Sequence, residues 1–144
     1  MANAQDVAAY IIDKCGEMTA MKLQKLLYYS QAWHLVWSEQ PLFGEEIQAW
    51  ANGPVVYDIY RKHSGQFRVG EWPHGDASRL NADEAGSVDA VLDAYMPFTA
   101  HQLSEMTHHE DPWRIAREGV NDGVRSNRPI SLASMHEYYS ARTA

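Results

Sequence analysis

The sequence contains a single cysteine, Cys15, among its 144 residues. One cysteine excludes an intrachain disulfide framework and any zinc site that needs several thiolates. A chain with so little cysteine suits a reducing compartment, and we expect a cytoplasmic protein. Cys15 is expected to pack at the end of the first helix, because no neighbouring base or oxyanion motif supports a nucleophile.

Long apolar runs are also missing. Every apolar stretch is interrupted well before the ~18 residues that a membrane span needs. The N-terminal segment MANAQDVAAY has no basic region followed by an apolar core, which a signal peptide would show. We therefore expect no contact with a membrane.

Positive charge is scarce. Twelve Lys and Arg face nineteen Asp and Glu, which gives a net charge of −7, and no run of five basic residues occurs. Phosphate backbones repel such a chain, so the sequence disfavours a nucleic-acid partner and favours a protein partner. The helix expected over 20–38 has only Lys22 and Lys25 as basic residues, too few for reading the major groove.

Motifs for catalysis are absent as well. The chain has no GxSxG, no phosphate-binding GxxxxGK[ST] or GxGxxG, and no HExxH. The segment THHED at 107–111 offers metal-ligand residue types, but adjacent His108 and His109 point about 100° apart on a helix. It is interpreted either as a helix-to-helix corner or as the site of a His- or metal-dependent enzyme. We expect no catalytic residue, metal or cofactor.

What the chain does contain is the composition of a globular protein, with 45% apolar and 22% charged residues. Its length fits one domain, 1–144, with a single core. Caps and apolar spacings predict helices over about 4–15, 20–38, 54–63, 82–95, 100–108, 112–119 and 131–140. The prediction is an all-α, compact single-domain bundle of about six to seven helices, with a short strand or irregular turn at 42–51.

Two segments are candidate partner-binding regions. In the central helix, Leu23, Leu26, Leu27, Trp33, Val36 and Trp37 are expected on the inner side. Gln24, Tyr28 and Gln31 share a different face, which either binds a partner or bonds the NGPV loop and His108. The irregular stretch 64–80 is expected to be a surface excursion, whose Phe67 and Trp72 either pack back onto the body or bind a partner.

Three segments carry a resemblance to a known family. They are MTAMKLQKLLYYSQAWHL, PLFGEEIQAWANGPVVYDIYR and LSEMTHHEDPW, in this order. In order and spacing they resemble the Panacea domain of SocA-like antitoxins, over about residues 5–140. The matching positions are Lys22, Leu23, Gln24, Leu27, Tyr28, Gln31, Trp33, Trp50, Gly53, Pro54, Val55, His108 and Trp113.

The resemblance implies a small, mostly helical cytoplasmic protein of a bacterium or prophage that neutralises a toxin by direct binding. The toxin would be encoded by the neighbouring gene. Some such antitoxins pass the toxin to a protease, so an adaptor that delivers a partner to a protease is the alternative. No catalytic residues are implied. Trp50, Gly53, Pro54, His108 and Trp113 are expected to be structural, with Gly53 and Pro54 starting a helix and the two tryptophans anchoring the packing.

Overall fold

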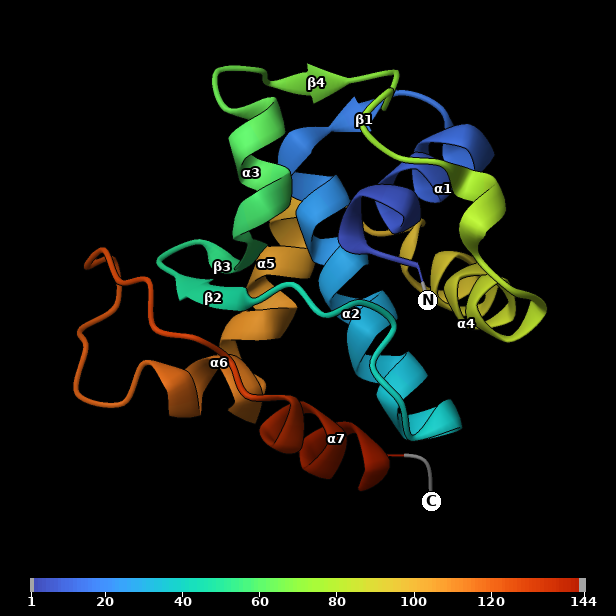
Figure 1. Ribbon diagram of the computed structural model, residues 1–144. Helices are drawn as coiled ribbons and strands as arrows, with labels where there is room; N and C mark the ends of the chain where they lie inside the picture. The colour runs from blue at the N-terminus through green and yellow to red at the C-terminus, as the bar shows by residue number, and fades with distance from the viewer. Residues whose placement is uncertain (1, 143–144) are drawn as a thin grey trace.

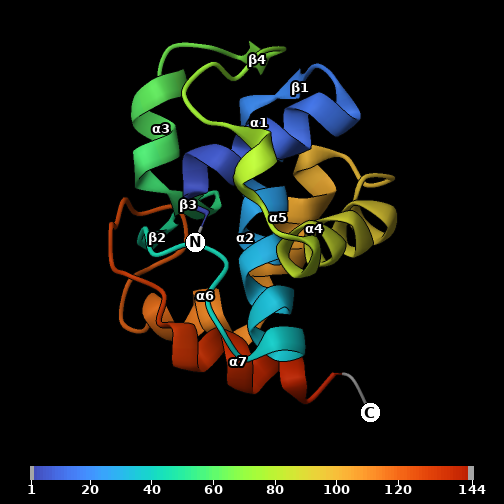
Figure 2. The same cartoon turned by 45° about the vertical axis from the view of Figure 1, so that its right-hand side comes forward.

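Helix α2 (Ala20–Ser38) runs through the middle of the computed structural model, which describes residues 2–142. It contacts α1 (Ala4–Cys15), α4 (Ala82–Tyr95), α5 (Ala100–His108) and α7 (Leu132–Ser140), as Figures 1 and 2 show. All residues from 23 to 32 are buried, because these neighbours surround the helix. The predicted helical bundle is confirmed, since the described residues form seven α-helices.

Side-chain caps explain why most helix bounds could be predicted. The Asn3, Asn81 and Thr99 side chains accept from backbone N–H groups three residues on, and Asp6, Glu84 and Gln102 return the bond. Thr19 and Ser131 cap α2 and α7 in the same way, without the return bond. None of these helices is long and apolar enough to cross a membrane, as far as residues 2–142 are concerned.

Residues 47–56 form a hairpin that the sequence only partly predicts. Strands β2 (Ile47–Trp50) and β3 (Gly53–Val56) pair antiparallel, with Pro54 opposite Ala49. Of the two alternatives for 42–51, a short strand or an irregular turn, the strand is present at Ile47–Trp50. The prediction that Pro54 starts a helix is wrong. Helix α3 (Tyr57–His63) begins three residues later, because the two β-branched valines after Pro54 complete the strand.

The segment 64–80 packs back onto the body rather than standing free. Its strand β4 (Arg68–Val69) pairs with β1 (Met18–Thr19), and a 3₁₀ turn, η1 (Ala77–Arg79), follows. Trp72 is buried and donates to Gln5 Oε1 at 2.9 Å. Phe67 is 79% exposed, so the packing alternative is confirmed for Trp72, and the binding of a partner by Phe67 stays a prediction.

Two smaller predictions need correction. Helix α6 (Asp111–Ala116) has Glu110 at its N-cap, so it begins one residue earlier than expected, with Pro112 in its first turn. Trp37 does not lie inside: it is 49% exposed and stacks on the half-buried Trp33, with ring centroids 5.5 Å apart. The last turn of α2 is covered on one side only, which leaves this face to solvent.

Candidate functional site

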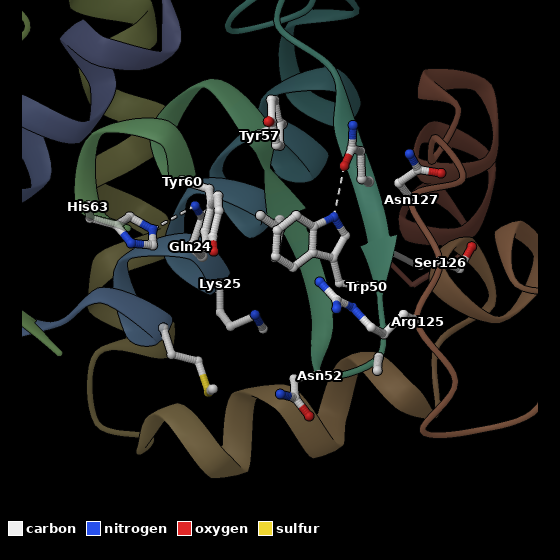
Figure 3. A pocket seen from close by; sticks show the side chains of 14 residues that line it. Gln24, Lys25, Trp50, Asn52, Tyr57, Tyr60, His63, Arg125, Ser126 and Asn127 are labelled. Carbon is white, nitrogen blue, oxygen red and sulfur yellow. Dashed lines mark hydrogen bonds between the residues drawn. The ribbon is translucent and has the colours of Figure 1, made fainter. Parts of the chain in front are cut away.

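A pocket of about 910 Å³ opens between α2, the β2–β3 hairpin, α3 and the loop after α6 (Figure 3). We call it the lysine pocket. Its lining consists of Met21, Gln24, Lys25, Gln48, Trp50, Ala51, Asn52, Val55, Tyr57, Tyr60, His63, Arg125, Ser126 and Asn127. None of these residues is acidic, although the whole chain has an excess of acidic residues.

Lys25 supplies a buried cation at the inner end of the pocket. Its side chain is 1% exposed, and its Nζ donates one hydrogen bond, to the Pro54 carbonyl at 3.1 Å. An ammonium has three donors, so this single acceptor leaves it short of partners. Burial away from water lowers the pKa of Lys25 from 10.5 to about 7, because no nearby carboxylate compensates for the lost hydration.

Gly53 makes room for this lysine. Its φ of 121° lies in the region that favours glycine. A Cβ atom at this position would lie 2.6 Å from Lys25 Cε and 3.1 Å from Thr107 Oγ1. Gly53 and Pro54 were expected to start a helix; instead, Gly53 lets the hairpin approach Lys25, and Pro54 supplies the acceptor for Nζ.

Gln24 ties α2 to the end of the hairpin. Its Oε1 accepts from Val56 N at 2.8 Å, and its Nε2 donates to Val56 O at 3.2 Å. The same Nε2 lies 3.0 Å from His63 Nε2. Since the amide nitrogen is the donor, His63 accepts with Nε2 and is in its neutral form. Burial lowers the pKa of His63, and the charge of Lys25 adds to this effect.

Aromatic rings form one wall of the pocket. Trp50 and Tyr60 meet edge to face, with centroids 4.7 Å apart, and Tyr57 lies beside Tyr60 at 6.2 Å. Tyr57 and Met21 are both exposed at the rim. Figure 3 shows Arg125 on the opposite wall, extending toward the same space as Lys25. Arg125 is exposed and makes no hydrogen bond or ion pair within residues 2–142.

A second buried polar group lies next to the pocket on α2, and we call it the tyrosine cluster: Tyr28, Tyr29, Tyr139 and Glu110. Tyr29 and Tyr139 donate to Glu110 Oε1 at 2.7 and 2.8 Å, and the Tyr28 hydroxyl lies 3.0 Å from that of Tyr139. Burial raises the pKa of all three phenols, and it also raises that of Glu110. Each of these polar groups has a partner.

The three side chains that were predicted to share one face of α2, Gln24, Tyr28 and Gln31, make different contacts. Gln31 holds residues 42–43, with Oε1 accepting from Leu42 N at 2.7 Å and Nε2 donating to Phe43 O at 2.7 Å. Tyr28 belongs to the tyrosine cluster, and Gln24 bonds Val56, the residue directly after the NGPV loop. The expected bond to His108 is not made by any of the three side chains among residues 2–142. All three side chains are buried. Binding of a partner by them, and by Trp72 and Phe67, stays a prediction.

The THHED segment forms a corner between α5 and α6. His108 stacks on Trp113 at 4.2 Å between centroids, and Trp113 Nε1 donates to Trp50 O at 2.8 Å. This stack connects two of the residues expected to be structural to the hairpin. Within residues 2–142 no group of three His, Cys, Asp or Glu side chains could hold a metal ion. Glu110, in the same corner, accepts hydrogen bonds from the hydroxyl groups of Tyr29 and Tyr139.

Lys25 and Arg125 were not predicted as site residues. A signal for Lys25 did exist: α2 is apolar nearly all round, so a lysine in its middle has no solvent-facing side to occupy. Nothing in the sequence places Arg125, because it follows α6 in a loop without periodicity.

The family of this chain can be read from one comparison. The family model described as antitoxin SocA-like, Panacea domain, matches residues 23–114, more than half of the chain. No curated protein and no solved structure matches. The matched range includes Lys25, Gly53 and His63 of the lysine pocket, whereas Arg125 lies outside it.

Proposed function

Because the chain belongs to the SocA-like antitoxin family with a Panacea domain, we propose that it neutralises a cognate protein toxin by binding it directly. The family match over residues 23–114 is the observation that carries this proposal. The antitoxin would act by holding another polypeptide, without making or breaking a bond. The toxin would be the product of the neighbouring gene, and the two would meet in the cytoplasm.

The surface around the lysine pocket supports the proposal. Met21 and Tyr57 expose apolar side chains at its rim, and Arg125 is an exposed cation without a partner among residues 2–142. Protein interfaces combine aromatic and arginine anchors of this kind in their centres. The acidic total charge of the chain further favours a protein over a nucleic acid as the partner.

The test is co-expression of the chain with the product of the neighbouring gene. We expect restored growth and a stoichiometric complex that survives size-exclusion chromatography. If growth is not restored and no complex forms, the proposal is wrong.

Toxin levels distinguish binding alone from delivery to a protease. If binding is sufficient, the toxin accumulates to normal amounts in the rescued cells and stays inactive in the purified complex. Loss of toxin that requires both this chain and a cellular protease would instead favour the adaptor alternative.

A further inference from the structure

We propose that the lysine pocket receives an acidic side chain, Asp or Glu, of the bound toxin, with Lys25 as the cation at its inner end and Arg125 as a second cation at its mouth. This inference rests on the proposed function and adds the anchor of the interface. Burial, charge and hydrogen-bonding capacity of the described residues support it.

Five of the twelve Lys and Arg side chains have a carboxylate partner, and the two cations of the pocket belong to the seven that have none among residues 2–142. The five side chains with a carboxylate within 4.0 Å are Lys14, Arg61, Arg68, Arg79 and Arg114. Lys25 and Arg125 have none among residues 2–142. A chain with nineteen acidic residues thus keeps both cations of this pocket free of them. A carboxylate from outside is the group that this arrangement lacks.

The hydrogen-bonding capacity of Lys25 points the same way. A buried ammonium is costly unless it is paired, and Lys25 has only the Pro54 carbonyl. Because Gly53 carries no side chain, the Lys25 side chain fits closely against the hairpin, where a Cβ atom would lie 2.6 Å from Cε. A carboxylate that reaches Nζ would provide the missing acceptors and the opposite charge.

The rim explains why the acid would belong to a polypeptide. Tyr57 and Met21 are exposed at the mouth, and Trp50 and Tyr60 line the wall behind them. Apolar residues that flank an Asp or Glu in a toxin segment would pack on these side chains. A free small anion would leave this apolar surface uncovered.

Binding of a carboxylate would be coupled to proton uptake. Burial lowers the pKa of Lys25 to about 7, so part of the unbound protein carries a neutral amine at neutral pH. The other titratable or charged groups that line the pocket are His63, Tyr57, Tyr60 and Arg125, and His108 lies close enough to feel the charge of Lys25. Both histidines have lowered pKa values and stay neutral above pH 7. Toxin affinity should therefore fall by up to about tenfold per pH unit above about 7.

The first experiment measures toxin affinity by calorimetry at about pH 6.5 and about pH 8.5. Lys25→Met keeps an unbranched side chain, one atom shorter, and removes the charge. We expect this variant to bind at least about tenfold more weakly at the lower pH and to lose the pH dependence. Lys62→Met is the matched control, because Lys62 is exposed on α3 and does not line the pocket. If Lys25→Met binds like the wild type while the complex forms, the inference is wrong and the proposed function stands.

The second experiment needs no toxin. NMR follows the titration of the Lys25 side chain in the presence of N-acetyl-glutamate α-amide or its neutral counterpart, N-acetyl-glutamine amide. We expect the carboxylate probe alone to raise the midpoint of Lys25 and to leave Lys62 unchanged. If neither probe shifts the midpoint, or if inorganic phosphate shifts it as far, the pocket is not a receptor for acidic side chains. Because this readout is independent of the toxin, failure of the pocket and failure of the proposed function can be told apart.

Discussion

The tyrosine cluster and the lysine pocket lie within one turn of each other on α2, yet they differ in how completely their polar groups are satisfied. In the cluster, Glu110 receives two hydroxyl groups and the Tyr28 hydroxyl contacts that of Tyr139. In the pocket, Lys25 has one acceptor and no carboxylate in the part of the chain that the structure describes. Burial of a polar residue therefore does not by itself mark a binding site. The proposed anchor rests instead on an unmet hydrogen-bonding capacity beside an open cavity.

The two sites also differ in what they do for stability. A fully satisfied polar network specifies one packing of the surrounding helices. A buried amine without a counter-charge costs free energy, which a bound carboxylate would offset. The cluster should therefore respond to mutation mainly through folding, and the pocket mainly through pH and ligand.

The largest expected effect is in the cluster. Tyr139→Ala removes a ring that is 1% exposed, together with the hydroxyl that links Tyr28 to Glu110. We expect a loss of about 3–5 kcal/mol in the free energy of unfolding, measured by urea denaturation. Tyr138→Ala, at the half-buried neighbour on α7, is the control and should cost clearly less. Equal losses would contradict the assignment of a structural role to the cluster.

The lowered pKa of Lys25 in the pocket should be measurable in the pH dependence of the free energy of unfolding. The unfolded chain keeps the Lys25 proton up to about pH 10.5 and the folded protein releases it near 7, so unfolding takes up a proton in this range. The free energy of unfolding should thus gain a few kcal/mol from Lys25 between about pH 7 and 10, and Lys25→Met should lose this gain.

Other groups act in the opposite direction at higher pH. Burial raises the pKa of Cys15 and of the tyrosines in the cluster, so stability due to them falls as the pH rises past 9. These groups are the same in the wild type and in Lys25→Met. The difference between the two pH profiles of the free energy of unfolding therefore reports Lys25 alone. Parallel pH profiles would show that the lysine keeps its ordinary pKa.

A smaller effect should come from Gly53. Gly53→Ala places a methyl group 2.6 Å from Lys25 Cε on a backbone with φ 121°, and we expect it to cost about 1–3 kcal/mol. Adding Lys25→Ala should recover the part due to the contact, which a double-mutant cycle measures. Gly86→Ala is the control: it lies within α4 with no atom nearby, and should stabilise by about 0.5–1 kcal/mol. Strict additivity would disprove a contact between Gly53 and Lys25.

The smallest effect on folding is expected in the segment 64–80. Phe67→Ser should change the free energy of unfolding by less than about 0.5 kcal/mol, because the ring is exposed. Trp72→Phe should cost about 1 kcal/mol by leaving Gln5 without its donor. A reversed order in thermal melts would contradict the packing described for this segment. If Phe67 binds the toxin, its substitution should weaken the complex without affecting stability.

The sequence predicted the helices well because their start signals are local. Five helices begin within one residue of their predicted starts, each with a side-chain cap: Asn3, Thr19, Asn81, Thr99 and Ser131. At Pro54 two local signals compete: proline suits a first helical turn, but here it follows a glycine with positive φ and precedes two β-branched residues. Residues 53–56 form a strand because they pair with residues 47–50. No local sequence pattern reveals this pairing.

The candidate site was harder to predict than the fold. Gln24 and Gln31 were correctly placed on α2, but which group each amide bonds depends on segments eleven to thirty-two residues away. The burial of Lys25 depends on the hairpin closing over it, and Arg125 reaches the pocket from a loop a hundred residues later in the chain. Such placements follow from tertiary packing alone.

The bond between the hydroxyls of Tyr28 and Tyr139 joins positions 111 residues apart. Helix α7 therefore closes over α2 only after nearly all of the described residues have left the ribosome. Until then the phenols of α2 and the Glu110 carboxylate are not covered by α7. The loop that carries Arg125, between α6 and α7, is not yet held in place at its C-terminal end. For the proposed binding of a toxin, the complete pocket would therefore be available only after this delay.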